Sequence, residues 1–318
     1  MSSSSSAYHL SVKTISRASR TKRLADGTMR TRPGRTAVAA AAYRAARLLR
    51  RWLEGKIAMT HDFRAKRGVI ASYILAPAGA GWALDRERLW NAAEDAETRK
   101  NSVTAREYEI AIPADLPESE RFLVVRDFAQ SLVDQFGVAV DLALHAPSVA
   151  GDQRNYHAHL LTTTRVVTAD GLGAKTRALD ARGTGPKLVE EIRARWASLC
   201  NSALERAGSA TRVDHRSYVR RGITRRPMLH EGHRATALTR RLGVATRYAA
   251  HNAVIRAYNA SIDAILAILR AAAAAPPAAA PVPMRLMMPG PRLTLPPTVA
   301  MEISNEQSSA TLGSGPLR

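Results

Sequence analysis

Hydrophobic and polar residues alternate with a period of two in several short segments of this chain, and in others they recur at helical spacing. The alternating segments, which predict strands, are residues 8–13, 69–75, 106–113, 138–144 and 157–164. The segments with helical spacing are residues 36–53, 85–100, 118–136 and 186–207, followed by one or two Ala-rich helices over residues 235–273. The pattern therefore predicts a mixture of strands and helices.

Polar and Gly-rich segments separate these elements. Residues 16–35 carry seven basic residues against a single acid, Asp26, and predict a flexible loop. The segment after Arg165, with four glycines up to Gly185, predicts a second loop. The Ser run at residues 1–6 predicts a disordered N-terminus, and the Ala/Pro-rich residues 274–318 predict a disordered tail.

The net charge of the chain indicates more about its partners than its length does. The formal net charge of the 318 residues is +20, mostly from arginine, and the isoelectric point is near 11.1. Such a balance indicates a nucleic-acid partner, because the guanidinium fork suits phosphate. The alternatives are an anionic membrane surface and a merely solvated basic surface. With one cysteine, Cys200, no intrachain disulfide can form. No signal peptide is found, and Pro276 and Pro277 interrupt the apolar C-terminal run. The expectation is a cytoplasmic protein without membrane insertion.

The candidate chemistry centres on three histidines. His157 and His159 are two residues apart in a strand-like run, so their side chains share one face. His145 ends the preceding strand-like run, and a turn about Gly151 would place it opposite His157. Three neutral imidazoles would then face one divalent cation and leave coordination positions open, as in a catalytic site. The alternative is a set of solvated strand-end histidines.

A nucleophile candidate lies in the helix that Thr36 is expected to cap. Tyr43 stands in a run of small residues, and a continuous helix would put Arg47 and Arg50 on its face. Two guanidinium groups would favour the phenolate or bind a DNA phosphate. The alternative is an ordinary amphipathic core tyrosine.

The order of these motifs resembles that of the MobA/MobL plasmid-mobilisation relaxases. The resemblance covers about residues 7–234, and the segments that carry it are residues 8–17, 34–44, 105–113, 137–145, 154–159, 162–165, 203–208 and 213–218. It implies an α+β fold of the His-hydrophobe-His (HUH) endonuclease type. Such a fold has a central antiparallel β-sheet flanked by helices, here followed by a helical extension at 235–273.

The resemblance also implies an activity and roles for residues. Tyr43 would attack one strand at a plasmid transfer origin, forming a 5′-phosphotyrosine that is later resealed. His145, His157 and His159 would hold Mn²⁺ or Mg²⁺. Glu107 would be the acidic residue near the site, with Glu109 as its neighbour; the sequence does not decide whether Glu107 orients a histidine, binds metal or accepts a proton. The expected DNA-binding residues are Arg44, Arg47, Arg50, Arg154, Arg165 and Arg216.

The resemblance further implies partners and leaves alternatives open. The partners are single-stranded plasmid DNA at the transfer origin, accessory relaxosome proteins and a type IV secretion coupling protein. A replication initiator using the same site, or a basic DNA-binding protein without chemistry, are the other functions considered. Residues 18–33 are an insertion relative to the family and either touch DNA or loop out. The glycines at 171–173 lack the spacing of a phosphate-binding loop, and the basic segment with His215, His230 and His233 suggests phosphate contacts or a second metal site.

Overall fold

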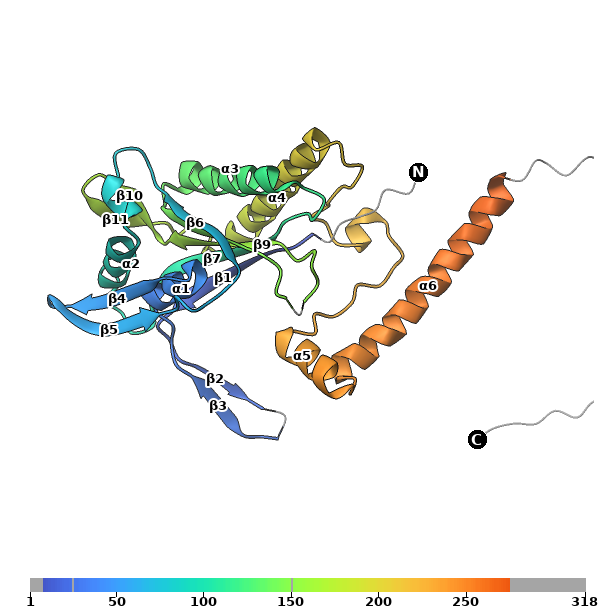
Figure 1. The fold of residues 1–318 in the computed structure, drawn as a ribbon, viewed down its shortest axis with the longest axis horizontal. Helices are drawn as coiled ribbons and strands as arrows, with labels where there is room; N and C mark the ends of the chain where they lie inside the picture. Colours follow the sequence, from blue (N-terminus) through green and yellow to red (C-terminus); the bar gives the residue numbers. More distant parts are fainter. Residues whose placement is uncertain (1–7, 25, 150, 275–318) are drawn as a thin grey trace, which may run out of the picture. The chain divides into compact units, whose positions relative to one another are not determined.

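A five-stranded antiparallel sheet forms the centre of the protein (Figure 1). The computed structural model describes residues 8–24, 26–149 and 151–274. The sheet has the strand order β1-β7-β9-β8-β6, and every neighbouring pair is antiparallel. Its strands are β1 (Leu10–Ser16), β6 (Val69–Leu75), β7 (Val103–Ala111), β8 (Val140–His145) and β9 (His157–Thr163). The predicted α+β fold with a central antiparallel sheet is confirmed.

Helices cover both faces of this sheet because its buried strands are apolar on both sides. On one face, Tyr108 and Leu160 pack with Phe128 of α3 (Glu118–Phe136) and Trp196 of α4 (Gly185–Arg206). On the other face, Leu161 belongs to a second buried cluster. That cluster includes residues of α1 (Ala37–Ala45), α2 (Arg86–Asp95) and the short 3-10 helix η1 (Gly81–Leu84). The helix expected at 118–136 has the bounds predicted for it, and Gly137 ends it with a positive φ of 62°.

The helix expected over residues 36–53 is wrong in its second half. Thr36 caps the start as predicted, its hydroxyl accepting from the Ala39 N–H at 3.1 Å. The helix ends at Ala45, and Ala46 takes the left-handed conformation. The chain then forms the hairpin of β4 (Leu48–Leu53) and β5 (Lys56–Asp62), whose turn holds Glu54 and Gly55 at positive φ. Gly55 is therefore a hairpin-turn residue and not a helix end.

Two segments expected to be loops are also hairpins. Residues 16–35 contain β2 (Arg20–Arg23) paired with β3 (Met29–Arg32), a two-stranded arm that is separate from the main sheet. The segment after Arg165 contains β10 (Arg165–Thr168) paired with β11 (Gly171–Lys175). Because these segments are rich in basic residues or glycine, the sequence pattern did not indicate their strands. These strands pair locally, over a few residues, across turns.

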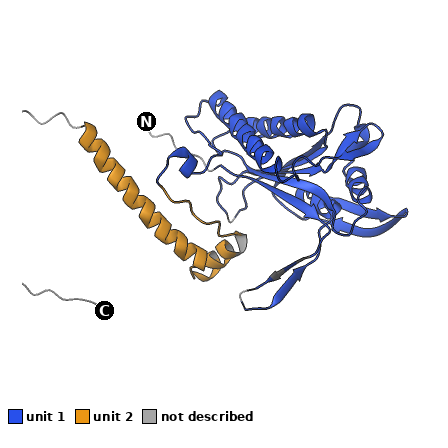
Figure 2. Cartoon of the chain, turned by 180° about the vertical axis from the view of Figure 1, so that it is seen from behind, with its two compact units in different colours: residues 1–224 blue, residues 225–318 orange. Residues whose placement is uncertain are grey.

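The chain divides into two compact units, residues 1–224 and residues 225–318 (Figure 2). The 3-10 helix η2 (Val219–Arg221) is near the end of the first unit. The second contains α5 (His233–Leu242) and α6 (Arg247–Ala274), where one or two helices were expected. The expected disordered segments, residues 1–6 and nearly all of 274–318, lie outside the described residues.

Helix α6 has polar contacts along one side within the second unit. Asn252 and Asn259 exchange backbone hydrogen bonds with Leu229 and Arg226, and Asp263 pairs with Arg225. By length and mean hydropathy (1.2) alone, α6 is long and apolar enough to cross a membrane. Helices that never enter a membrane can have the same length and composition.

Candidate metal centre and nucleophile

The three predicted histidines meet on one face of the sheet. His145 of β8 is the cross-strand partner of His157 in β9, as the sequence predicted, and His159 is two residues further along β9. One ring nitrogen from each histidine lies within 4.8 Å of the others. The ring centroids are 4.9–5.4 Å apart. The period of two puts these side chains on the face that α1 covers, while Ala158 and Leu160 point into the opposite core.

Each histidine has one nitrogen held by an acceptor. His145 Nε2 donates to the Arg44 carbonyl oxygen at 2.8 Å, and His157 Nδ1 donates to the Asn155 carbonyl oxygen at 2.9 Å. A carbonyl oxygen can only accept, so each of these nitrogens carries the proton and the other nitrogen of the ring keeps a lone pair. Burial lowers the pKa of His145 to about 3 and also lowers that of His157. Both rings are therefore neutral at neutral pH, the form that binds metal.

Glu107 fixes the third histidine. The Glu107 Oε1 atom accepts from His159 Nδ1 at 2.7 Å and from Arg44 Nε at 2.6 Å, and the residue is 2% exposed. Burial alone would raise the pKa of Glu107, but the hydrogen bonds and charges of His159 and Arg44 outweigh it and hold the pKa well below its usual range. An ionised carboxylate can only accept, so His159 Nδ1 carries the proton and Nε2 is the nitrogen left to bind a metal. The neighbouring Glu109 is instead paired with Lys13.

These three lone pairs fit a divalent cation. In each of the three histidines, one ring nitrogen is bonded to a carbonyl or carboxylate oxygen and the other is available. A metal-binding histidine usually has this form. Three ligands of this kind leave further coordination positions for water or substrate. Within the described residues, this is the one group of three or more His, Cys, Asp or Glu side chains that could hold a metal ion.

Helix α1 brings Tyr43 to the same face of the sheet. The next residue, Arg44, contacts the site twice, through its carbonyl to His145 and its side chain to Glu107. The Tyr43 side chain is 51% exposed, so solvent and substrate can reach the phenol. The ring packs edge-on against Phe63, with ring centroids 5.3 Å apart and an interplanar angle of 89°. An exposed tyrosine held from the side suits a nucleophile better than a core tyrosine.

Sequence reasoning missed Lys66. Its Nζ atom lies 4.2 Å from the centroid of the Tyr43 ring and donates to the Tyr43 carbonyl oxygen at 3.0 Å. Burial, and then the charge of Arg44, lower the Lys66 pKa to about 8. The signal in the sequence was weak, since Lys66 is 23 positions from Tyr43 in a segment with no motif. The positively charged side chain next to the Tyr43 phenol is thus Lys66, from the loop between β5 and β6.

The expected placement of Arg47 and Arg50 beside Tyr43 is wrong. The helix ends before them, so Arg47 follows the left-handed Ala46 and Arg50 lies in β4. Ala46 can end the helix because the Arg47 N–H bonds to the Ala42 carbonyl oxygen at 3.0 Å. Both arginine residues remain exposed.

The other predicted DNA-binding arginines have carboxylate partners. Arg44 is bound to Glu107, and Arg165 bonds to Glu97 at 3.0 Å and to the Ala96 and Gly173 carbonyls. The Arg44 side chain is 11% exposed and the Arg165 side chain 27%, and their DNA-binding role stays a prediction. Arg154 pairs with Asp152 in an exposed loop.

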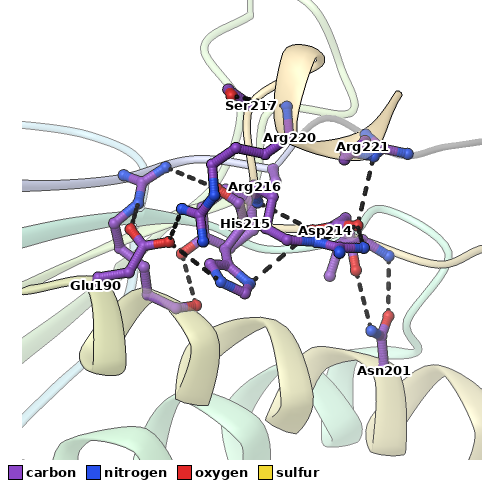
Figure 3. A network of polar contacts seen from close by, with 11 residues as sticks. Glu190, Asn201, Asp214, His215, Arg216, Ser217, Arg220 and Arg221 are labelled. Carbon is purple, nitrogen blue, oxygen red and sulfur yellow. Dashed lines mark hydrogen bonds and ion pairs between the residues drawn. The ribbon is translucent and has the colours of Figure 1, made fainter. Parts of the chain in front are cut away.

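Arg216 lies in a network around His215 (Figure 3). Its guanidinium pairs with Asp214 at 2.8 Å, and the His215 ring lies between Glu190, 3.4 Å from Nε2, and Asp214, 3.9 Å from Nδ1. Asn201 of α4 exchanges two hydrogen bonds with the Val213 backbone. The network anchors the segment after α4 on that helix. His230 lies in the other unit, and the His233 side chain is outside the described part of the chain, so the second metal site that was considered stays a prediction.

Comparison with known proteins gives a consistent result. The model of the MobA/MobL family matches residues 35–241. The mobilization protein MobL of Acidithiobacillus ferridurans is 35% identical over 266 residues, 76% of this chain and 65% of that protein. A probable conjugal transfer protein TraA of Sinorhizobium fredii is 32% identical over 237 residues, 65% of this chain and 21% of that protein. This chain thus spans less than two thirds of the length of either relative.

One solved structure is similar over the same region. It is described as "Molecular Basis of Vancomycin Resistance Transfer in Staphylococcus aureus" and has a TM-score of 0.53 at 29% sequence identity. The match covers 67% of this chain and all of that chain.

Proposed function

This chain belongs to the MobA/MobL family, and from that premise we propose that it is a relaxase that cuts and rejoins one strand of plasmid DNA at a transfer origin. The observation that carries the proposal is the meeting of two features on one face of the sheet. One ring nitrogen from each of the three histidines lies within 4.8 Å of the others there. Helix α1, which carries the exposed Tyr43, is bonded through Arg44 to His145 and to Glu107, which in turn binds His159.

His145, His157 and His159 would hold a divalent cation, Mn²⁺ or Mg²⁺. Bound there, the cation would withdraw charge from an oxygen of the scissile phosphate. The role of Glu107 is to fix the His159 ring, because its Oε1 atom is occupied by His159 and Arg44 and the residue is buried. Because Oε1 is already bonded to both groups, we favour the orienting role of Glu107. The two other roles considered were metal ligand and proton acceptor.

Tyr43 would be the nucleophile. Its phenolic oxygen forms a bond to phosphorus while the bond from phosphorus to the 3′-oxygen breaks. The phenolic proton leaves to solvent, which the exposure of the side chain allows, and the 3′-oxygen takes up a proton. The ammonium group of Lys66 lies 4.2 Å from the centroid of the ring and supplies positive charge beside the phosphate that Tyr43 would attack. Because the phosphodiester is exchanged for a phosphotyrosine ester, resealing is the reversal of the step and needs no nucleotide.

The partners belong to the same proposal. The substrate would be single-stranded DNA at the transfer origin, met in the cytoplasm, with accessory proteins of the relaxosome and a type IV secretion coupling protein. The net charge of +20 supports a polyanionic substrate.

The test is the covalent adduct. The protein is incubated with Mn²⁺ and a single-stranded oligonucleotide that covers the transfer origin of its plasmid, and a denaturing gel is run. We expect an adduct in the wild type that Tyr43→Phe and chelator abolish. Tyr248→Phe, which removes another exposed hydroxyl, keeps the adduct. An adduct retained by Tyr43→Phe contradicts the assigned nucleophile, and a wild type that nicks a replication origin instead supports an initiator.

A further inference from the structure

Helix α1 ends in a way that leaves a backbone acceptor of the proposed nucleophile open to another segment. In a longer helix, the Arg47 N–H would bond to the Tyr43 carbonyl oxygen, four residues before it. Here the Arg47 N–H bonds to the Ala42 carbonyl oxygen, because Ala46 takes the left-handed conformation. The Tyr43 carbonyl oxygen therefore has no partner within its own helix.

Lys66 supplies that partner. Its Nζ atom donates to the Tyr43 carbonyl oxygen at 3.0 Å and also lies over the Tyr43 ring, 4.2 Å from the centroid. A positive charge suits this place, because the C-terminal end of a helix carries a partial negative charge. One ammonium group thus contacts both the backbone and the side chain of the same tyrosine.

A short turn of residues 63–66, between β5 and β6, brings Lys66 to this position. The Phe63 N–H bonds to the Arg47 carbonyl oxygen at 3.2 Å, and the Lys66 N–H bonds back to the Phe63 carbonyl oxygen at 2.9 Å. The 63–66 turn is therefore fixed to the backbone at the end of α1.

Two side chains of the 63–66 turn contact the Tyr43 ring from different directions. Phe63 packs against it at an interplanar angle of 89°, with ring centroids 5.3 Å apart, and Lys66 lies over it. A tyrosine side chain that is 51% exposed would otherwise exchange between rotamers in solvent. The contacts from both residues restrict the ring to one orientation.

Lys66 occupies this place against its own electrostatic preference. Its side chain is partly buried, and in the described part of the chain no salt bridge joins it to a carboxylate. Burial, and then the charge of Arg44, lower the pKa of Lys66 to about 8, so the fold weakens this charge. A lysine that served only solubility would extend its ammonium into water. Such a cost beside a proposed reaction centre points to a functional role.

We propose that Lys66 is a positioning residue, which together with Phe63 holds the Tyr43 side chain in one orientation before DNA arrives. The inference rests on the proposed function, because the held phenol is the proposed nucleophile. Orienting a reacting group in advance lowers the barrier, since less freedom is lost during the attack. The hold requires neither DNA nor metal, unlike the charge that the same ammonium would supply to a phosphate.

The first test observes the ring directly, without DNA or metal. A ring-fluorinated tyrosine is incorporated at position 43 alone of the full chain, and its fluorine NMR resonance is compared with that of the free amino acid at neutral pH. We expect a displaced resonance with Lys66 present and in Lys66→Arg, because a guanidinium group can also donate to the carbonyl and lie over the ring. In Lys66→Met the resonance is expected to move toward that of the free amino acid. A resonance that does not respond to Lys66→Met would overturn the proposal.

The second test measures the rate of adduct formation in a single turnover, with the oligonucleotide at saturating concentration so that affinity does not enter. Lys66→Met is expected to lower this rate about 10- to 100-fold. Phe63→Leu removes a ring contact without changing the charge, so a smaller loss in the same direction is expected. Lys66→Arg is expected to keep most of the rate.

The matched control is Arg67→Met, which removes one positive charge from the exposed position next to Lys66. This control is expected to keep the rate at saturation. An equal fall in Arg67→Met, or a slower Lys66→Met whose fluorine resonance is unchanged, would mean that charge near the phosphate sets the rate, and the positioning role would be wrong. Thermal unfolding of every variant checks that the fold is kept.

The two assays separate this inference from the proposed function. If the wild type forms the Tyr43 adduct but Lys66→Met changes neither the resonance nor the rate, only the positioning role fails. If no adduct forms and the resonance still responds to Lys66→Met, the proposed reaction fails and the hold on the Tyr43 ring is supported.

Discussion

At the scale of single residues, the most consequential contact is the one from Glu107 to His159. A buried carboxylate fixes which nitrogen of the ring carries the proton and which keeps its lone pair. Arg44 binds the same carboxylate oxygen, so the helix that carries Tyr43 and a histidine share one anchor. A change at Glu107 would therefore act on the proposed metal centre without removing a candidate ligand.

We expect Glu107→Gln to weaken Mn²⁺ binding by about 10- to 100-fold, the usual effect of losing such a partner. The amide no longer supplies the charge that fixes His159 and balances Arg44. Titration calorimetry of the variant against the wild type measures the change. The control is Glu109→Gln on the same strand, which removes a carboxylate paired with Lys13. Similar losses in both variants would mean that general charge, and not the His159 contact, sets the affinity.

At the scale of elements, the position of α1 depends on how the chain returns from the β2–β3 arm. The Arg17 N–H bonds to the Ser102 carbonyl, and the Arg35 N–H bonds to the Ser16 carbonyl. Gly34 lies so close to this crossing that a Cβ atom there would be 1.8 Å from the Arg17 carbonyl oxygen. Glu94 then joins the Arg17 side chain to the first N–H of α1, at Ala37. Residues far from Tyr43 thus determine where its helix begins.

We expect Gly34→Ala to destabilise the protein by about 1–3 kcal/mol, because backbone atoms must move to admit the methyl group. The corresponding fall in Tm is roughly 3–10 °C. Calorimetry or circular dichroism measures it. Gly81→Ala is the control, since a Cβ atom at Gly81 would meet nothing within 4 Å. Equal Tm values for the two variants would show that the crossing at Gly34 can relax freely.

At the scale of the whole molecule, the two faces of the sheet differ in what they carry. Its α3/α4 face is an apolar core, whereas its α1/α2 face is apolar at one end and carries the histidines at the other. The three ligand candidates come from two adjacent strands, and the glutamate comes from a third. Any ion bound there joins β8 and β9, the two strands of one hairpin, so its binding should stabilise the folded state.

We expect Mn²⁺ at 100 times its Kd to stabilise the protein by about 2.7 kcal/mol, because the unfolded chain has no assembled site. This corresponds to a rise in Tm of roughly 5–10 °C. Chelator should reverse the rise, and His157→Ala should remove it. A similar rise in His157→Ala would place the stabilising ion elsewhere on the chain.

Short-range patterns in the sequence determined several features. The alternation at residues 157–164 fixed which side chains share a face, and the turn residues before it fixed His145 opposite His157. The amphipathic period and the glycine at its end fixed α3. The order of motifs indicated the family. Each of these depends on neighbours within a few residues or on one hairpin.

Only the tertiary structure decided where α1 ends and what surrounds Tyr43. Residues 46–53 have good helical spacing, yet α2 holds them as a strand: Asn91 accepts from the Trp52 N–H, and Glu87 from the Arg50 N–H. These partners are about forty positions away in the sequence, so no local pattern indicates them. Lys66 reaches Tyr43 in the same way, and Arg44 reaches Glu107 across 63 positions of the sequence. Contacts between distant segments can outweigh local helix preference because burial and hydrogen bonding together exceed the small free-energy differences of propensity.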